Sequence, residues 1–221
     1  PLVEQTSIIK LHAQPTAQFR SSLSLPASPT LTNIFCDLYM WSWALTIMKP
    51  DNQFQFAKSQ HLTQVTALRA QIDDFSYGKH AHEEFSFGVT LAGRQDFFSS
   101  GAFHRSLPGN IIVFNPDEVH DGHSGVDDAL RYRMVYIHPN QLEPMLATAG
   151  VKDSRDFRIA DTLIDDAQLR QHILNMALLV EDERDNKLQQ ECELYQLAAR
   201  VAQRYGQYSP DRVVRKVDRL L

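Results

Sequence analysis

The sequence predicts a mainly β fold with helices towards its C-terminal end. Between residues 64 and 137, short runs of apolar or alternating residues are separated by glycines and prolines, which is typical of a β-barrel or β-sandwich. After Pro139 the apolar residues recur with the period of an amphipathic helix. A chain of 221 residues with 43% hydrophobic residues is long enough for one core and an accessory element.

Six short runs are the expected strands. The residues between them supply the turn geometry that hairpins need, because glycine adopts left-handed conformations and proline pre-sets its own backbone angle. The turn residues are Gly93, Gly101, Pro108-Gly109, Pro116 and Gly122. The expected strands are Gln64 to Phe75, His82 to Leu91, Arg94 to Ser99, Phe103 to Ser106, Ile111 to Asn115 and Arg131 to Ile137.

Two amphipathic helices are expected next. The first begins at a cap formed by Asp165-Asp166 and ends before the polar residues 181–186, and the second runs from about Lys187 to Tyr205 and stops at Gly206. Their apolar stripes either pack on the barrel or form an antiparallel helix pair used for dimerisation. The first stripe is Leu169, Ile173, Ala177 and Val180; the second is Leu188, Cys192, Tyr195, Ala199, Ala202 and Tyr205.

The two ends of the chain differ from the middle. Residues 1–50 form an irregular segment rich in Ser, Thr, Pro and Gln, which is either an extension upstream of a natural start at Met48 or an arm that folds over the barrel. We expect residues 51–140 to form the barrel and residues 141–208 to form the helical segment, which serves dimerisation if its two helices form an antiparallel pair. At Ser209-Pro210-Asp211 an amphipathic basic helix begins, with four basic and two acidic residues. We expect residues 209–221 to open a further domain.

Composition limits the compartment and the partners. The formal net charge of −5 argues against an extended basic surface for nucleic acid on this chain. Cys36 and Cys192 are too few for a disulfide framework, which favours reduced thiols in the cytoplasm over a single structural disulfide. No apolar run reaches the ~18 residues that span a bilayer. Asp37 interrupts the apolar stretch 34–48 and no basic region precedes it, which argues against a signal peptide.

Histidines mark the candidate site. On a strand, His80, His82, Glu84 and Ser86 would share one face, and His120 follows a proline turn. Imidazoles two residues apart can hold a metal ion or a polar ligand from the same side. Such a pair is also found as satisfied polar core residues or at an exposed strand edge.

These motifs resemble a known family. The order Gly78-x-His80-x-His82, Gly93, Pro108-Gly109 and Asn115-Pro116-x-x-x-His120 is similar to the two motifs of the cupin barrel. More narrowly, the segments NPDEVHDG (115–122) and RYRMVYIHP (131–139) resemble the ligand-binding domain of AraC/XylS-type bacterial transcription regulators. The resemblance runs from about Leu62 to the end. It implies a cupin or jelly-roll β-barrel, helices that dimerise, and a helix-turn-helix DNA-binding domain beginning near Val213.

The chain departs from the family pattern at three positions. Ser86 stands where the cupin glutamate ligand would fall, so a metal set is incomplete unless Glu84 substitutes. Ala92 stands where the arabinose-binding member has a sugar-contacting arginine, which argues against arabinose; Tyr132 and Met134 fall at two other pocket positions of that member. Asp117 replaces a usual glycine, and aspartate tolerates the left-handed conformation, so we expect the turn to survive.

The resemblance favours the effector-binding and dimerisation region of an AraC-type regulator, without enzymatic activity or a cofactor. Such a region would bind a small molecule, form a cytoplasmic homodimer and control DNA binding by a domain beyond Leu221. The expected ligand-binding residues are His80, His82, Glu84, His120, Tyr132 and Met134, with His104 and His123 at the surface. The alternative is a metal-dependent cupin enzyme, a dioxygenase or isomerase, in which His80, His82 and His120 bind a divalent metal. A dimeric binding module without output is a third possibility.

Overall fold

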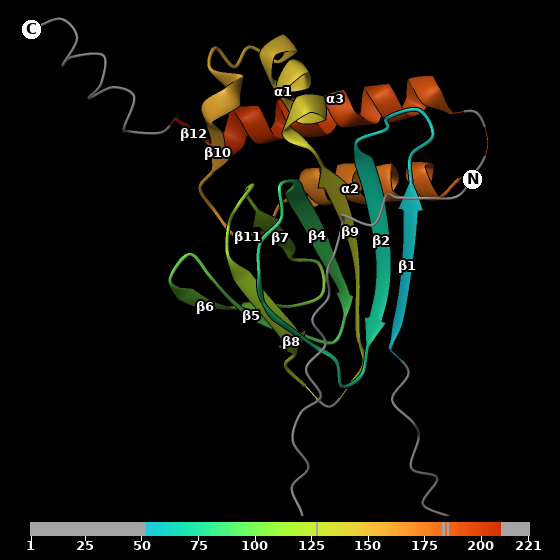
Figure 1. Cartoon of the computed structure of the whole chain (residues 1–221), viewed down its shortest axis with the longest axis vertical. Coiled ribbons are helices and arrows are strands. Elements are labelled where there is room, and N and C mark those ends of the chain that lie inside the picture. Colours follow the sequence, from blue (N-terminus) through green and yellow to red (C-terminus); the bar gives the residue numbers. More distant parts are fainter. Residues whose placement is uncertain (1–51, 127, 183, 185, 209–221) are drawn as a thin grey trace, which may run out of the picture.

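The computed structural model describes residues 52–126, 128–182, 184 and 186–208 of the chain (Figure 1). The expectations for residues 1–50 and 209–221, and for Cys36, lie outside this range. Cys192 is an exposed free thiol. None of the helices within the described ranges is long and apolar enough to cross a membrane.

Two antiparallel sheets of six and four strands form most of the β part of the described chain, as the sequence predicts (Figure 1). The six-stranded sheet has the order β1-β2-β9-β4-β7-β11, and the four-stranded sheet has the order β3-β8-β5-β6. The larger sheet contains β1 (Gln53–Lys58), β2 (Val65–Ile72), β9 (Leu130–Ile137), β4 (Phe85–Ala92), β7 (Ile111–Phe114) and β11 (Leu163–Ile164). The smaller sheet contains β3 (Ser76–His80), β8 (His120–Ser124), β5 (Gln95–Ser99) and β6 (Ala102–Ser106).

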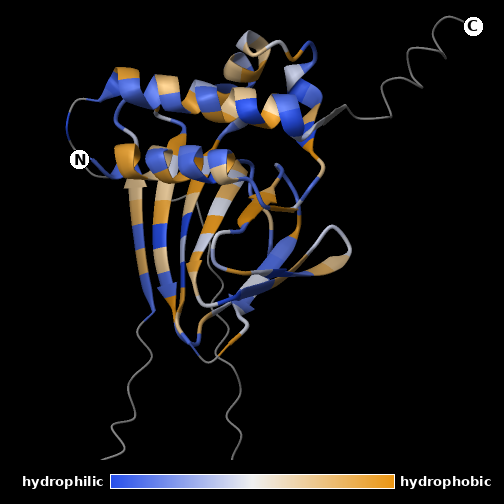
Figure 2. Cartoon of the chain, turned by 180° about the vertical axis from the view of Figure 1, so that it is seen from behind, coloured by the Kyte–Doolittle hydropathy of each residue, from blue (hydrophilic) through white to orange (hydrophobic). Residues whose placement is uncertain are grey.

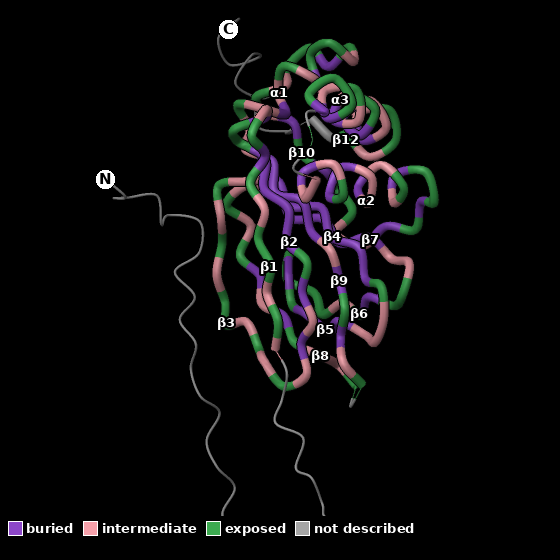
Figure 3. The backbone as a smooth tube through the Cα atoms, turned by 90° about the vertical axis from the view of Figure 1, so that its right-hand side faces the viewer, coloured by how far each residue is buried: buried purple, intermediate pink, exposed green. Residues whose placement is uncertain are grey.

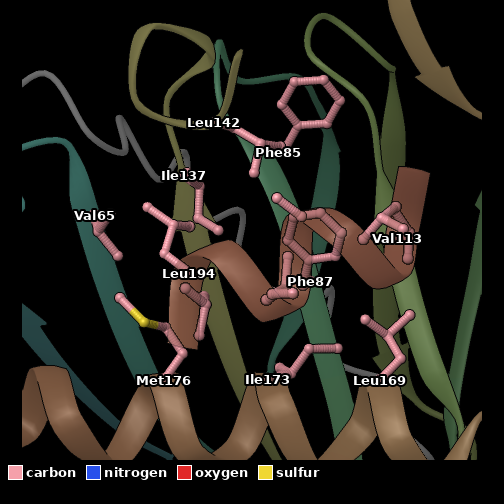
Figure 4. Packing of buried hydrophobic residues seen from close by; sticks show 14 of the residues in the cluster. Val65, Phe85, Phe87, Val113, Ile137, Leu142, Leu169, Ile173, Met176 and Leu194 are labelled. Atoms are coloured by element: carbon pink, nitrogen blue, oxygen red, sulfur yellow. The ribbon is translucent and has the colours of Figure 1, made fainter. Parts of the chain in front are cut away.

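Side chains of the larger sheet fill two separate cores. Alternation along β9 sends Tyr132, Met134 and Tyr136 into a core that includes Phe97 of the smaller sheet, and sends Val135 to the helix side. Figure 4 shows the helix-side core, where Phe87, Val113 and Ile137 face residues of α2 (Ala167–Glu181). The inner strands of the larger sheet, β2, β9, β4 and β7, therefore lie largely buried between the helices and the smaller sheet, whereas the edge strand β1 is largely exposed, as the burial colours in Figure 3 show.

The first predicted helix is confirmed. Asp166 is the N-cap of α2, its carboxylate accepting from the backbone N–H groups of Gln168 and Leu169, and the helix buries the predicted stripe together with Met176. α3 (Lys187–Arg204) packs on α2 and on α1 (Pro139–Thr148). Both α2 and α3 carry hydrophobic and hydrophilic residues along their length (Figure 2).

The predicted apolar stripe of α3 was right at Ala202 and Tyr205, which pack against the core, and wrong at its beginning. Leu188 is 72% exposed and Cys192 is exposed, whereas the buried face contains Gln190, Leu194, Leu197, Ala198 and Val201. Gln190 belongs to that face because its amide donates to the Leu179 carbonyl and to the Asn186 side chain. A buried glutamine with hydrogen-bond partners shifts the packed face away from the one that hydrophobicity indicates.

Besides the strands β1, β8 and β11, one two-stranded sheet and the helix α1 were not predicted. α1 begins at Pro139, with Pro144 inside it, and buries Leu142 and Leu146 one turn apart. A short 3-10 helix, Ser154–Asp156, follows it. The two-stranded sheet pairs β10 (Phe157–Ile159) with β12 (Gly206–Tyr208), directly after α3 (Figure 1).

Left-handed residues close the turns. Asp117 has φ of 62°, so the prediction that aspartate supports this turn is confirmed. Gly93, after β4, has φ of 72°. A Cβ at Gly93 would lie 2.9 Å from the Ala129 carbonyl oxygen and 3.0 Å from the Leu130 Cα. Both backbone conformation and space therefore require glycine there.

Replacing Gly93 with alanine is expected to lower the free energy of unfolding by about 2 kcal/mol, because a strained backbone adds to a contact with rigid main chain. Gly101→Ala is the matched control, since Gly101 has φ of 77° and nothing within 4 Å of its Cβ position. Urea unfolding of both variants separates backbone strain from steric overlap. Equal losses in the two variants would contradict the role of the close contact.

Candidate functional site

Three histidines meet where the two sheets approach each other. His80, at the end of β3, is the register partner of His120, at the start of β8. The ring centroids of His80 and His120 lie 4.4 Å apart, and those of His82 and His120 lie 5.0 Å apart. We call His80, His82 and His120 the histidine cluster.

The histidine cluster does not lie on one continuous strand, which corrects the sequence interpretation. β3 ends at His80 and β4 begins at Phe85, so residues 81–84 form a bend between the two sheets. Two contacts hold the His82 ring beside the other two histidines. Its Nδ1 lies 3.0 Å from the Glu84 carbonyl oxygen, and its ring lies edge-on to that of Tyr136, with centroids 5.5 Å apart. The bend therefore performs the alignment that strand alternation was expected to perform.

Backbone carbonyls fix the tautomer of all three rings. Nδ1 of His80 lies 2.7 Å from the Gly78 carbonyl oxygen, and Nδ1 of His120 lies 2.8 Å from the Glu118 carbonyl oxygen. The contact of His82 with Glu84 is of the same kind. Because a carbonyl oxygen can only accept, Nδ1 must carry the hydrogen in each ring. A neutral ring of this tautomer presents Nε2 as a hydrogen-bond acceptor.

Ser86 occupies one of these acceptors. Its hydroxyl lies 3.0 Å from Nε2 of His82, and the residue is fully buried. Since that Nε2 lacks a hydrogen, Ser86 donates to it. Among the described residues, none donates to Nε2 of His80 or His120. Two acceptors of the histidine cluster therefore remain available for an incoming molecule.

Burial keeps two members of the cluster, His82 and His120, uncharged. Burial, together with the neighbouring imidazoles, lowers the pKa of His120 to about 3, and burial also lowers the pKa of His82. The His120 ring stacks on Phe114 with centroids 3.6 Å apart and an interplanar angle of 13°. An apolar ring on one face gives the imidazolium no hydration there, so the neutral form prevails at pH 7.

Tyr132 and Met134 lie deeper, within the core between the sheets. The Tyr132 hydroxyl is 2.7 Å from that of Tyr77, and the Met134 sulfur accepts from the Tyr136 hydroxyl at 3.5 Å. Burial raises the pKa of Tyr77 to about 12 and that of Tyr132 well above its usual range. These phenols remain protonated, and their hydroxyls partner each other.

A cavity opens beside His120. Its volume is about 310 Å³, and the residues that line it are Lys79, Phe98, Ser100, Gly101, Glu118, Val119 and His120. This volume lies at the lower end of the range for small-molecule sites. The Lys79 ammonium lies 5.7 Å from the centre of the Phe98 ring, in a cation–π arrangement. His120 is the only residue of the predicted site that lines this cavity.

Glu118 is charged but has its acceptors occupied. Its carboxylate accepts from the hydroxyls of Ser99 and Ser100, and from the backbone N–H and the side-chain amide of Asn115. Burial opposes the charge, but these four hydrogen bonds outweigh it and hold the pKa of Glu118 below its usual value. The carboxylate therefore orders the turn before His120.

The residues do not fit a metal centre. No group of three or more His, Cys, Asp and Glu side chains in the described ranges could hold a metal ion. Ser86 stands where the cupin motif has its glutamate ligand. Its hydroxyl donates to Nε2 of His82, the nitrogen that would otherwise bind the metal. Glu84 contacts His82 through its backbone carbonyl oxygen and not through its carboxylate.

The outer histidines differ from each other. His123 is exposed, as expected. His104 is half-buried instead, because its ring stacks on Phe97 at 5.0 Å and its Nε2 lies 3.3 Å from the Ser99 carbonyl oxygen. The prediction that His104 is a surface residue was therefore wrong.

Sequence reasoning missed three contributors to the site. Tyr77 directly precedes the motif Gly78-x-His80-x-His82, but its spacing gives no signal for its contact with Tyr132. Phe114 and Lys79 likewise contribute through tertiary placement. Ser86 was noted only as a missing ligand, although a hydroxyl at that position is itself a signal for a hydrogen-bonded histidine.

Comparison with known proteins identifies a family resemblance. The family model described as AraC-like ligand binding domain matches residues 62–198. No curated protein matches the chain in sequence. Among solved structures, a Cupin 2 conserved barrel domain protein from Salinispora arenicola CNS-205 is 17% identical, with 43% of this chain and 81% of that chain covered and a TM-score of 0.36.

Two other solved structures are similar to part of the chain. The Cupin_2 domain of an XRE family transcriptional regulator from Enterobacter cloacae is 12% identical, with 41% of this chain and 97% of that chain covered and a TM-score of 0.35. A DMSP lyase from Ruegeria pomeroyi DSS-3 is 18% identical, with 34% and 38% covered and a TM-score of 0.31.

Proposed function

The chain belongs to the family of AraC-like ligand-binding domains, and we propose that it is the effector-binding region of an AraC-type bacterial transcription regulator. In this proposal the barrel binds a small molecule and has no enzymatic activity. A helix-turn-helix domain after Leu221 binds DNA, and the regulator works in the cytoplasm as a homodimer. Exposed Leu178 (52%) and Leu188 (72%), on α2 and α3, support a dimer contact through these helices.

One observation carries the proposal: His120, whose Nε2 is an available acceptor, is one of the residues that line a cavity of about 310 Å³. The ring cannot rotate freely, because Glu118 holds its Nδ1 and Phe114 stacks on its face. An acceptor held in place beside a cavity selects ligands by geometry.

The chemistry of the lining indicates the class of effector. Neutral His120 accepts a hydrogen bond, so the effector carries a hydroxyl or amine donor. Lys79 supplies a positive charge on another wall, where an acceptor oxygen can bind. Phe98 and Val119 add apolar contact. We therefore propose a small hydroxylated compound with at least one further acceptor oxygen.

Thermal unfolding in the presence of small compounds tests this function. Polyols, hydroxy acids and amino alcohols are compared with carboxylic acids that have no hydroxyl or amine. A true effector at 100 times its Kd stabilises the fold by about 2.7 kcal/mol. We expect this response only from donor-bearing compounds.

His120→Asn is the decisive variant. The asparagine amide reaches the position of Nδ1 and keeps a donor for Glu118, while the acceptor at Nε2 is lost. The response to the effector should disappear in His120→Asn and persist in His123→Asn, a change at an exposed position on the same strand. An intact response in His120→Asn would exclude the proposed contact.

A further inference from the structure

β10 and β12 form an isolated pair of strands at the end of α3. Three residue pairs join them, with Ile159 opposite Gly206. Two-stranded sheets of this length are marginally stable alone, so contacts from outside the pair must hold it in place. β12 is also the last element of the described chain, immediately before residue 209.

Asn115 supplies two of these outside contacts. Its side-chain oxygen accepts from the Ile159 N–H at 2.8 Å, and its side-chain nitrogen donates to the Ile159 carbonyl at 3.0 Å. A single amide thereby satisfies both backbone groups of Ile159, as a neighbouring strand would do. Arg158 adds a third contact by donating to the Pro116 carbonyl at 3.0 Å.

The same turn is bonded to the histidine cluster. The Glu118 carboxylate accepts from the backbone and the side chain of Asn115, both at 3.0 Å, and the Glu118 carbonyl accepts from Nδ1 of His120. A continuous series of hydrogen bonds thus runs from His120 through Glu118 and Asn115 to Ile159.

The other strand of the pair is tied to the helices. The Ala160 N–H donates to the Tyr205 carbonyl, and the Tyr205 hydroxyl donates to Asp166 at the start of α2. A displacement of β10 therefore reaches both the exit of α3 and the beginning of α2.

We infer that the turn Asn115–His120 couples occupancy of the cavity beside His120 to the position of the β10–β12 pair, with Asn115 as the positioning residue. A ligand that binds Nε2 of His120 changes the preferred position of the imidazole ring. Because Nδ1 of the same ring is bonded to the Glu118 carbonyl, the turn shifts with it. Asn115 then holds or releases β10. This inference rests on the proposed function for its biological meaning, but the coupling itself is a property of the chain without effector.

Hydrogen exchange of the whole chain tests the coupling. In His120→Gln the donor at the Nδ1 position is lost, and we expect the Ala160 amide to exchange about tenfold faster, the factor for losing roughly one hydrogen bond. His120→Asn keeps that donor and should leave the exchange at Ala160 within a factor of about two. The pair of variants separates the Nδ1 contact from the loss of the imidazole.

Two further variants make the result decisive. Asn115→Ala alone should accelerate exchange at Ala160, and adding His120→Gln should give no further increase, because the link is already broken. Ile72→Val loosens the core between the sheets from β2, a strand that pairs with neither β7 nor β8. The inference is overturned if Ile72→Val accelerates Ala160 as much as His120→Gln, or if the effects of His120→Gln and Asn115→Ala simply add.

The outcome is independent of the effector test. If a compound binds and His120→Gln leaves Ala160 unchanged, the coupling fails while the proposed function stands. If the coupling is present and no compound binds, the proposed function fails instead.

Discussion

Unfolding measured from pH 6.5 down to pH 3 is expected to show a loss of stability of about 1.4 kcal/mol per pH unit from His120 alone. The pKa of His120 is lowered from 6.5 to about 3 in the fold, chiefly by burial. Between these values the unfolded chain binds a proton that the folded chain does not, so the folded state loses stability as the pH falls. The contribution of His120 is fully present above pH 6.5, and by pH 3 the loss is of the order of 4 kcal/mol.

His120→Asn isolates this contribution, because asparagine does not titrate and keeps the donor for Glu118. Urea unfolding of wild type and His120→Asn at several pH values should give curves whose difference changes between pH 6.5 and pH 3 and is constant above. His123→Asn should follow wild type throughout, since His123 is exposed. Parallel curves for wild type and His120→Asn would show that His120 protonates freely in the fold.

The sequence predicts most of the barrel because alternation and turn residues are local signals. β2, β4, β5, β7 and β9 lie where the apolar runs indicate. β8 was missed because its sequence, His120 to Ser124, contains no apolar residue; it forms a strand through pairing with β3 and β5. α1 was missed because two prolines conceal the pair of leucines that it buries.

The sequence predicts which histidines form the candidate site, but it does not predict how the fold brings them together. His80, His82 and His120 do meet, yet the reason is a bend at residues 81–84 and the register of β3 with β8. Neither feature has a periodic signature. The contacts of Ser86 with His82 and of Asn115 with Ile159 join residues through the tertiary fold, so only coordinates reveal that one completes the cluster and the other connects it to β10.

Asp166→Ala is expected to lower the free energy of unfolding by about 4 kcal/mol, the scale for breaking a buried ion pair. The Asp166 side chain is 4% exposed, and its carboxylate accepts two hydrogen bonds from Arg200, at 2.9 and 3.0 Å, and one from the Tyr205 hydroxyl. It also caps α2. Alanine removes the cap and leaves Arg200, itself 21% exposed, without its counter-charge.

Asp165→Ala is the matched control, because the neighbouring carboxylate is 85% exposed and lies 3.5 Å from Arg170. An exposed pair of this kind contributes about 0.5 kcal/mol or less. Thermal and urea unfolding of the two variants should therefore differ widely, and similar losses would contradict the buried role of Asp166.

The same carboxylate defines a second acid transition. Although burial opposes its charge, hydrogen bonds from Leu169, Tyr205 and Arg200 hold the pKa of Asp166 at about 2, below its usual value of 3.8. Its contribution is present above pH 3.8 and is lost as the pH falls towards 2, below most of the His120 window. Because Tyr205 directly precedes β12, Asp166→Ala should also loosen β12 while leaving the histidine cluster intact, which distinguishes the helix end of the coupling from its cavity end.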